Sequence, residues 1–436
     1  MKTTKKALLA AVALSGIEAF SAGFGFYEMD AASTAFGGHV FGQPLNASAV
    51  YYNPAAMSTL TGTVVTLDFT AVNPRADARV DKKHDTRMNS GWICAPTFFI
   101  TQELPWGFHF GFGGFADFGI ASAYNNHWEL KYDSTETSFE GYTLQPVLSY
   151  EIIDDKWSFA AGPRFTYCSF ETKMKRDFKF VDNMYMLQSH GYLHAPVRGK
   201  DRLRIHADNE DDIGIGLAAA TQFRVTDDFA LGVMYRSRMK TELEGRSSWR
   251  GSDLRHGNDA KEKIQLPAQV TLGFNWDNAL WVEGLHLGSS VSWIEWSKMS
   301  AIRFDVYNPV SGQVEKNSIK MDWRNTYRAG FGVGYDLTKN WTVLGGYTYD
   351  WDPCRNKIGY AHTMLPLGDR HIASTGLTWK TDDGKWEISV AYAMIILESK
   401  TQKIKDEYYD YNKTVHKMHT HNAYTSLVSA GVTYHF

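Results

Sequence analysis

Three histidines near the C-terminus, His416, His419 and His421, come nearest in type and spacing to a metal site. Such histidines can bind a metal, but an exposed cluster that no cysteine or carboxylate frames is a weak metal signal. The three cysteines are far apart, so they support neither a zinc site nor a disulfide framework, and at most one pair could form. The sequence therefore predicts no metal and no cofactor.

Serine, histidine and aspartate are plentiful, and together such residues can supply a nucleophile and its base. No Gly-x-Ser-x-Gly or comparable motif places them at catalytic spacing, so we expect that the chain is not an enzyme. The formal net charge of the 436 residues is -3, which gives no basic balance and predicts no nucleic-acid partner.

In the elements that would position these side chains, apolar residues alternate with small or polar ones at a period of two. At the C-terminus Tyr424, Val428, Val432 and Phe436 share one face, whereas the other face is mostly small or polar. Successive side chains of a β-strand point to opposite sides of the sheet, so this pattern predicts a strand. Mean hydropathy is -0.34 and no apolar run approaches the roughly 18 residues of a membrane helix. In a strand that alternates, however, the polar residues cancel the lipid-facing ones when hydropathy is averaged over a window of residues.

The same rhythm recurs along the chain and predicts about fourteen strands, at residues 61–72, 90–102, 107–116, 140–152, 155–171, 211–224, 228–242, 262–276, 284–297, 322–337, 340–351, 369–381, 385–400 and 422–436. Short connections alternate strictly with long ones, which are predicted as loops at 73–89, 117–139, 172–210, 243–261, 298–321, 352–368 and 401–421. This alternation is typical of an all-β, antiparallel transmembrane β-barrel with short periplasmic turns and long external loops. We therefore expect an integral protein of the bacterial outer membrane.

The chain divides into three predicted parts. Residues 1–21 have a positive start, an apolar stretch and small residues before Ala22, as in a secretory signal peptide. Residues 22–60 are rich in glycine, alanine and serine and do not alternate, so we expect them to fill the lumen of the barrel at 61–436. The terminal Phe436, with Tyr434 two residues earlier, resembles the assembly signal of outer-membrane barrels.

A series of motifs extends in order over nearly the whole mature chain: the start Ala22-Gly23-Phe24 with Glu28, the stretch Ala31 to Thr34 followed by Gly37 and Gly38, the block Tyr52-Asn53-Pro54-Ala55-Ala56-Met57, Phe118 to Ala121, Trp293 to Ser297, Asp322 to Arg328, Asp350-x-x-Pro353 and Pro366-x-x-Asp369-Arg370. Together these motifs resemble the FadL-like outer-membrane transporters of long-chain fatty acids, a family that includes the toluene and xylene transporters and outer membrane protein P1.

The resemblance implies a fourteen-stranded barrel whose N-terminal hatch plugs the lumen, with Asn53, Pro54 and Ala55 in the hatch. It implies passive uptake in which a hydrophobic ligand binds, shifts the hatch and leaves sideways through the wall at a kinked third strand. Glycine inside a strand often marks a bulge or kink, so Gly111, Gly113 and Gly114 are the candidate lateral opening. Alternatively, these glycines merely face a crowded lumen beside the hatch.

Two further groups are candidate sites. The longest loop carries adaptable methionine and aromatic side chains that suit varied apolar ligands, and we expect a substrate groove at Phe178, Phe180, Met184, Tyr185, Met186 and Leu187, unless these residues only close the barrel top. Charges facing lipid near the membrane midplane cost about 2–4 kcal/mol, so Arg328, Asp350, Asp369 and Arg370 are expected to face inward as a polar network in the lumen.

Several functions stay open. The expected ligands are long-chain fatty acids, with an aromatic-hydrocarbon transporter, a surface receptor or adhesin, and an outer-membrane lipid hydrolase as alternatives. A general diffusion porin is disfavoured because it would lack a plug. The expected partners are the hydrophobic ligand, outer-membrane lipid and lipopolysaccharide, and the barrel-assembly machinery through Phe436. We expect a monomer.

Overall fold

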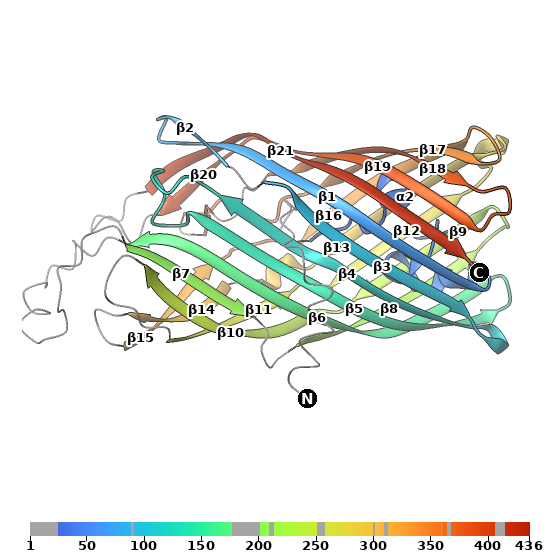
Figure 1. Cartoon of the computed structure of the whole chain (residues 1–436), viewed down its shortest axis with the longest axis horizontal. Helices are drawn as coiled ribbons and strands as arrows, with labels where there is room; N and C mark the ends of the chain where they lie inside the picture. The colour runs from blue at the N-terminus through green and yellow to red at the C-terminus, as the bar shows by residue number, and fades with distance from the viewer. Residues whose placement is uncertain are drawn as a thin grey trace, which may run out of the picture.

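The computed structural model describes residues 25–88, 91–176, 201–208, 213–250, 258–299, 301–308, 313–358, 360–363, 368–405 and 415–436. Fourteen antiparallel strands pair in a closed circuit, which the pairing of the last strand with the first completes (Figure 1). In circuit order they are β1 (Thr63–Val80), β3 (Ile93–Glu103), β4 (Phe108–Ala123), β5 (Glu136–Ile153), β6 (Trp157–Arg176), β8 (Gly214–Arg224), β9 (Phe229–Arg236), β12 (Gln269–Trp276), β13 (Leu285–Ile294), β16 (Thr326–Asp336), β17 (Trp341–Asp350), β18 (Arg370–Lys380), β19 (Trp386–Leu397) and β21 (Val415–His435). The predicted number of strands is confirmed.

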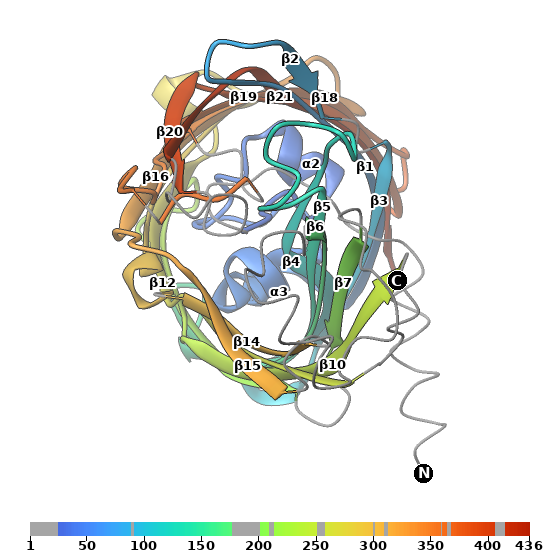
Figure 2. The same cartoon turned by 90° about the vertical axis from the view of Figure 1, so that its left-hand side faces the viewer.

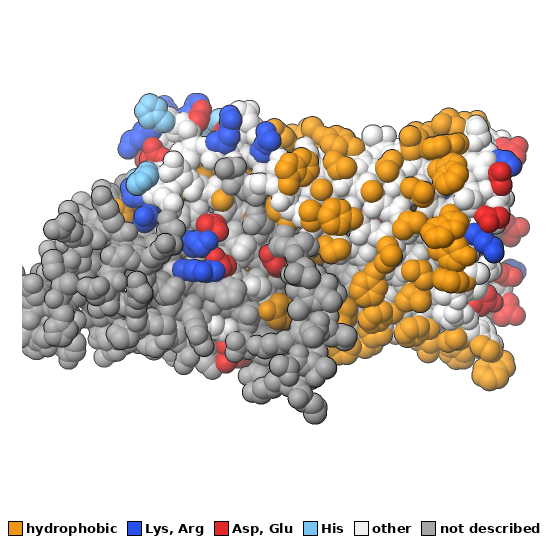
Figure 3. Space-filling view, viewed as in Figure 1, with side chains coloured by type: hydrophobic (Ala, Val, Ile, Leu, Met, Phe, Trp, Pro, Cys, Tyr) orange, Lys and Arg blue, Asp and Glu red, His pale blue; other side chains and the backbone are white. Residues whose placement is uncertain are grey.

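The outer face of the wall is apolar and the inner face is polar. In β19, exposed Trp386, Ile388 and Val390 alternate with buried Glu387 and Ser389. Figure 3 shows such hydrophobic side chains as a belt across the visible face of the barrel, over the part nearest the short turns. An apolar exterior with a polar interior is the arrangement that a strand needs between lipid and an aqueous lumen. Among the described helices, none is long and apolar enough to cross a membrane.

Beyond the belt, further strands extend the wall at the end where the long connections lie (Figure 1). They are β2 (Asp85–Arg87), β7 (Asp201–Asp208), β10 (Met239–Arg250), β11 (Asn258–Leu266), β14 (Ala301–Asn308), β15 (Gln313–Lys320) and β20 (Lys400–Lys405). The prediction that the long connections are loops is therefore wrong where these strands lie, whereas residues 124–135 form no strand. In the hairpin of β10 and β11, exposed Lys240, Glu242 and Glu244 alternate with buried Met239, Thr241 and Leu243. The outward face is therefore charged instead of apolar, unlike a lipid-facing strand, and backbone ladders hold the hairpins together.

The short connections meet at the opposite end, where β21 also ends (Figure 1). Three of the short 3₁₀ turns are η2 (Pro105–Gly107), η4 (Ala279–Trp281) and η5 (Trp296–Lys298), of which the first two lie at this end. The N-terminal segment, defined here as residues 25–60, does not join the wall. Its helices α2 (Ala31–Ala35), α3 (Ala49–Tyr52) and η1 (Pro54–Thr59) lie inside the ring of strands, as Figure 2 shows.

Candidate functional site: the lumen and the edge between β3 and β4

The N-terminal segment packs against the wall because glycines there leave room for its backbone. A methyl group added at Gly332 would collide with the carbonyl oxygen of Phe36, and one added at Gly288 would collide with that of His39. Glycine permits this close approach because it has no Cβ. Other wall glycines whose added Cβ would meet the segment are Gly232, Gly273, Gly330, Gly346 and Gly376. Sequence reasoning missed this set of wall glycines, although lumen-facing glycines recur in successive strands and could have indicated it.

Asn53, Pro54 and Ala55 form the turn that joins α3 to η1, and all three are buried. The Asn53 side chain accepts a hydrogen bond from the backbone N–H of Ala55 at 3.2 Å, so it caps η1. Its Nδ2 donates to the carbonyl oxygen of Phe41 at 2.5 Å. One side chain thus ties two stretches of the N-terminal segment together. That the segment acts as a hatch stays a prediction.

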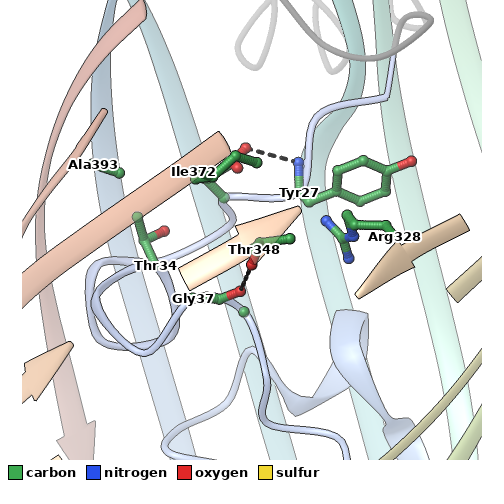
Figure 4. A pocket seen from close by; sticks show the side chains of 9 residues that line it. Tyr27, Thr34, Gly37, Arg328, Thr348, Ile372 and Ala393 are labelled. Atoms are coloured by element: carbon green, nitrogen blue, oxygen red, sulfur yellow. Dashed lines mark hydrogen bonds between the residues drawn. The ribbon is translucent and has the colours of Figure 1, made fainter. Parts of the chain in front are cut away.

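Three of the four residues predicted as a lumen network come together, and the fourth does not. Asp350 and Arg370 form a buried ion pair. The Arg328 guanidinium lies over the ring of Tyr27, 3.6 Å from its centroid, beside a small cavity that also touches Thr34 and Gly37 (Figure 4). Asp369 lies apart.

The place of Asp369 follows from its neighbours at the external end of β17 and β18. Its carboxylate accepts a hydrogen bond from the Tyr349 hydroxyl at 2.8 Å and another from the backbone N–H of Asp352 at 2.8 Å. These bonds tie the start of β18 to the end of β17, so the contacts of Asp369 are with the connection between the two strands rather than with the buried ion pair.

A second cationic cluster, which sequence reasoning did not single out, surrounds a small cavity on the other side of Tyr27. Arg164 forms a buried ion pair with Asp117, and the Arg236 guanidinium lies 4.0 Å from the ring centroid of Tyr51. Phe118 and Ile294 contribute apolar walls. This cavity is too small for a fatty acid as it stands.

Interruption of the wall is the second feature of the site. Pairing between β3 and β4 ends at Phe98 and Gly114, although β4 continues to Ala123 and stays paired with β5. Among the described residues, no strand pairs with this free edge of β4. A bulge against β5 follows Ala116, and from Gly113 onward β4 is buried on both faces until its last residue.

The start of the N-terminal segment contacts this region. Gly25 forms an isolated bridge with Phe118, and the backbone N–H of Phe26 donates to the carbonyl oxygen of Asp117 at 2.9 Å. Gly111 and Gly113 face the same segment, because an added Cβ at either would press on Val50. The Cβ of a larger residue at Gly114 would meet the ring of Phe98 instead.

The groove candidates at 178–187 lie outside the described residues. The histidine cluster lies on the extension of β21, where His416 Nδ1 is 2.6 Å from Asp81 and His421 Nε2 is 3.2 Å from Asp85. Within the residues that the structure describes, no group of three or more His, Cys, Asp or Glu side chains could hold a metal ion. Cys94, Cys168 and Cys354 form no disulfide with one another.

Comparisons with known proteins fit this geometry. A family model described as "Outer membrane protein transport protein (OMPP1/FadL/TodX)" matches residues 12–436. The chain is 24% identical over 415 residues to the "Putative outer membrane protein NMB0088" of Neisseria meningitidis serogroup B, covering 87% of this chain and 86% of that protein. It is 23% identical to the "Long-chain fatty acid transport protein" of Escherichia coli K12, covering 89% of this chain and 91% of that protein.

Solved structures show the same fold. A Pseudomonas aeruginosa FadL homologue superposes with a TM-score of 0.78 at 21% identity, covering 94% of this chain and 99% of that one. The Pseudomonas putida toluene transporter TodX gives a TM-score of 0.68 at 15% identity, covering 94% and 100%. The chain therefore belongs to the outer membrane protein transport protein family (OMPP1/FadL/TodX), whose members are integral outer-membrane β-barrels that transport hydrophobic compounds.

Proposed function

We propose that this chain is a passive uptake route for long-chain fatty acids across the outer membrane. The ligand enters the lumen from outside, displaces the N-terminal segment, which acts as a hatch, and leaves sideways between β3 and β4. The observation that carries this proposal is the free edge of β4 beyond Gly114, to which the N-terminal segment itself is bonded. A ligand that displaces the segment would free that edge.

The cationic cavity favours a carboxylate ligand over a plain hydrocarbon. Arg164 and Arg236 both line it, and among the described residues of its lining Asp117 is the one acid. The site thus holds an excess of one positive charge in a buried environment. Charge-assisted hydrogen bonds to a carboxylate are roughly twice as strong as neutral ones, whereas toluene offers a guanidinium only a cation–π contact and no hydrogen-bond acceptor. The apolar side chains of Phe118 and Ile294 suit the alkyl chain beside the head group.

The present cavities are small because the N-terminal segment occupies the lumen. Val50 and Met57 press against Gly111, and Gln145 donates to the carbonyl oxygen of Val50 at 2.5 Å. Uptake therefore requires the segment to move, since no long-chain ligand fits beside it. This is the physical reason to propose a hatch rather than a permanently open pore.

Assembly into the membrane is a separate proposal. Phe436 is 75% exposed, and its ring packs edge-on against Tyr434 at 4.5 Å between centroids. Exposed Phe436, beside half-buried Tyr434 at the end of the closing strand β21, is available to the barrel-assembly machinery. We also propose that the charged extension beyond the belt contacts lipopolysaccharide. The barrel is proposed to be a monomer.

A substitution at the exit tests the lateral route. Gly114→Val places a branched side chain against Phe98, whereas Gly345→Val on β17 is a matched control because an added Cβ there meets only ordinary contacts of 3.8 Å or more. In cells that lack their own transporter of this family, we expect labelled-oleate uptake to fall to about one tenth with Gly114→Val and to persist with Gly345→Val. A heat-modifiable gel band verifies that each barrel is folded. Full uptake by folded Gly114→Val would refute the lateral route.

A further inference from the structure

The connection between β4 and β5 is an ordered cap over the external mouth of the barrel. Within residues 124–135 the rings of Tyr124 and Trp128 stack at 4.1 Å, with an angle of 10° between their planes. The Trp128 Nε1–H donates to the carbonyl oxygen of Ser134 at 2.9 Å, and Leu130 is buried. In the end-on view of Figure 2 this connection, drawn in teal near the label of β5, folds inward over the lumen.

A second connection reaches the same place from the other side of the barrel. Residues 360–363 lie between β17 and β18. Six wall strands separate β5 from β17 in one direction, and four separate β4 from β18 in the other. The two connections therefore start from roughly opposite walls, and a contact between them spans the mouth.

Asp133 makes that contact. Its Oδ2 accepts hydrogen bonds from the backbone N–H of Thr363 at 2.8 Å and from the Thr363 hydroxyl at 2.5 Å. Its Oδ1 lies 3.6 Å from His362 Nδ1, and the other ring nitrogen of His362 lies 3.2 Å from the carbonyl oxygen of Lys320. Burial opposes ionisation of Asp133, yet the hydrogen bonds from His362 and Thr363 outweigh it and lower the pKa of its carboxyl group.

We propose that residues 124–135 form a lid over the external mouth, that the contact of Asp133 with Thr363 and His362 is its latch, and that this latch must open for a hydrophobic ligand to enter. The inference rests on the proposed transport function. Opening would expose Trp128 and Leu130, which are buried in the closed lid. A long-chain amphiphile could cover those side chains as it enters, so the apolar ligand itself would favour the open lid.

A covalent latch tests the lid directly. Asp133→Cys with Thr363→Cys, in a background whose three native cysteines are replaced by serine, places two thiols where the hydrogen bonds now lie. Dibromobimane reports bridging by fluorescence and, once bridged, holds the lid closed. We expect the bridged barrel to take up labelled oleate at about one tenth of the rate of its untreated form. The bridged pair Arg79→Cys with Asp85→Cys is the matched control, since that ion pair lies in the β1–β2 hairpin.

The opposite perturbation gives the second arm. Asp133→Asn keeps the shape of the side chain but removes its charge, and we expect initial oleate uptake to rise about threefold because hydrogen bonds to a charged acceptor are the stronger ones. Equal uptake by bridged and unbridged forms of a barrel that does transport oleate would overturn the latch. If the unbridged barrel takes up no hydrophobic ligand at all, the proposed function fails instead, so the two failures are distinguishable.

Discussion

Replacing Asn53 by alanine should loosen the N-terminal segment while leaving the barrel wall intact. The change removes the cap of η1, which costs about 1 kcal/mol, and leaves the buried carbonyl oxygen of Phe41 without its donor, which costs about 1–3 kcal/mol. Together these losses lower the free energy of opening the segment by about 2–4 kcal/mol. At 1.36 kcal/mol per factor of ten, the open population rises about 30-fold to 1,000-fold.

Hydrogen exchange measured by mass spectrometry reports this opening. The amides of Tyr52, Asn53 and Ala56 are bonded within the segment, so their exchange should accelerate by the same factor as the open population. Asn340→Ala is the control, because Asn340 bonds the carbonyl oxygen of Lys380 in an exposed turn outside the N-terminal segment. Unchanged exchange between residues 46 and 58 in Asn53→Ala would refute the reasoning.

Three further outcomes follow from single residues. Burial, aided by Arg328, lowers the pKa of His39 to about 3. Neutral His39 therefore stabilises the packed N-terminal segment fully above pH 6.5, the pKa of a free histidine, and this stabilisation is lost as the pH falls below 6.5. From pH 6.5 to 5 the free energy of opening the segment should drop by about 2 kcal/mol in hydrogen exchange, and a His39→Gln variant with the same pH dependence would contradict this. Arg236→Gln should lower oleate uptake about tenfold and leave toluene uptake unchanged, and an equal loss of both would argue against carboxylate recognition. Deleting Phe436 should reduce the heat-modifiable, folded band in outer-membrane fractions, whereas an undiminished band would remove this residue from assembly.

The strands of the wall could be predicted because each carries its own pattern. In β19 the alternation of Trp386, Ile388 and Val390 with small or polar residues is local, and lipid imposes it on every strand. The hairpin of β10 and β11 lies beyond the belt and does not face lipid. Glu242 and Glu244 on its exposed face are paired in register with Lys263 and Lys261, whereas Met239 and Leu243 are buried on the other face. The alternation therefore has charged residues outside, which a search for apolar lipid-facing strands does not pick out.

The site was harder to predict because its contacts join distant parts of the chain. Asp133 and Thr363 are 230 residues apart, and nothing in either loop indicates the other. The wall glycines that hold the N-terminal segment matter only once the segment lies against them. Arg164 and Arg236 have the lumen-facing register of their strands, and only the fold shows that they share one cavity with one carboxylate.

The central claim is that this barrel takes up long-chain fatty acids. Uptake of labelled oleate and labelled toluene should be measured side by side in cells that lack their own transporter of this family and express this chain, with cells that express no barrel as the baseline. The account predicts oleate uptake well above baseline and above that of toluene. Toluene uptake without oleate uptake would contradict the assignment of the cationic cavity. Uptake of neither by a folded outer-membrane barrel would contradict the transport account itself and favour a receptor role.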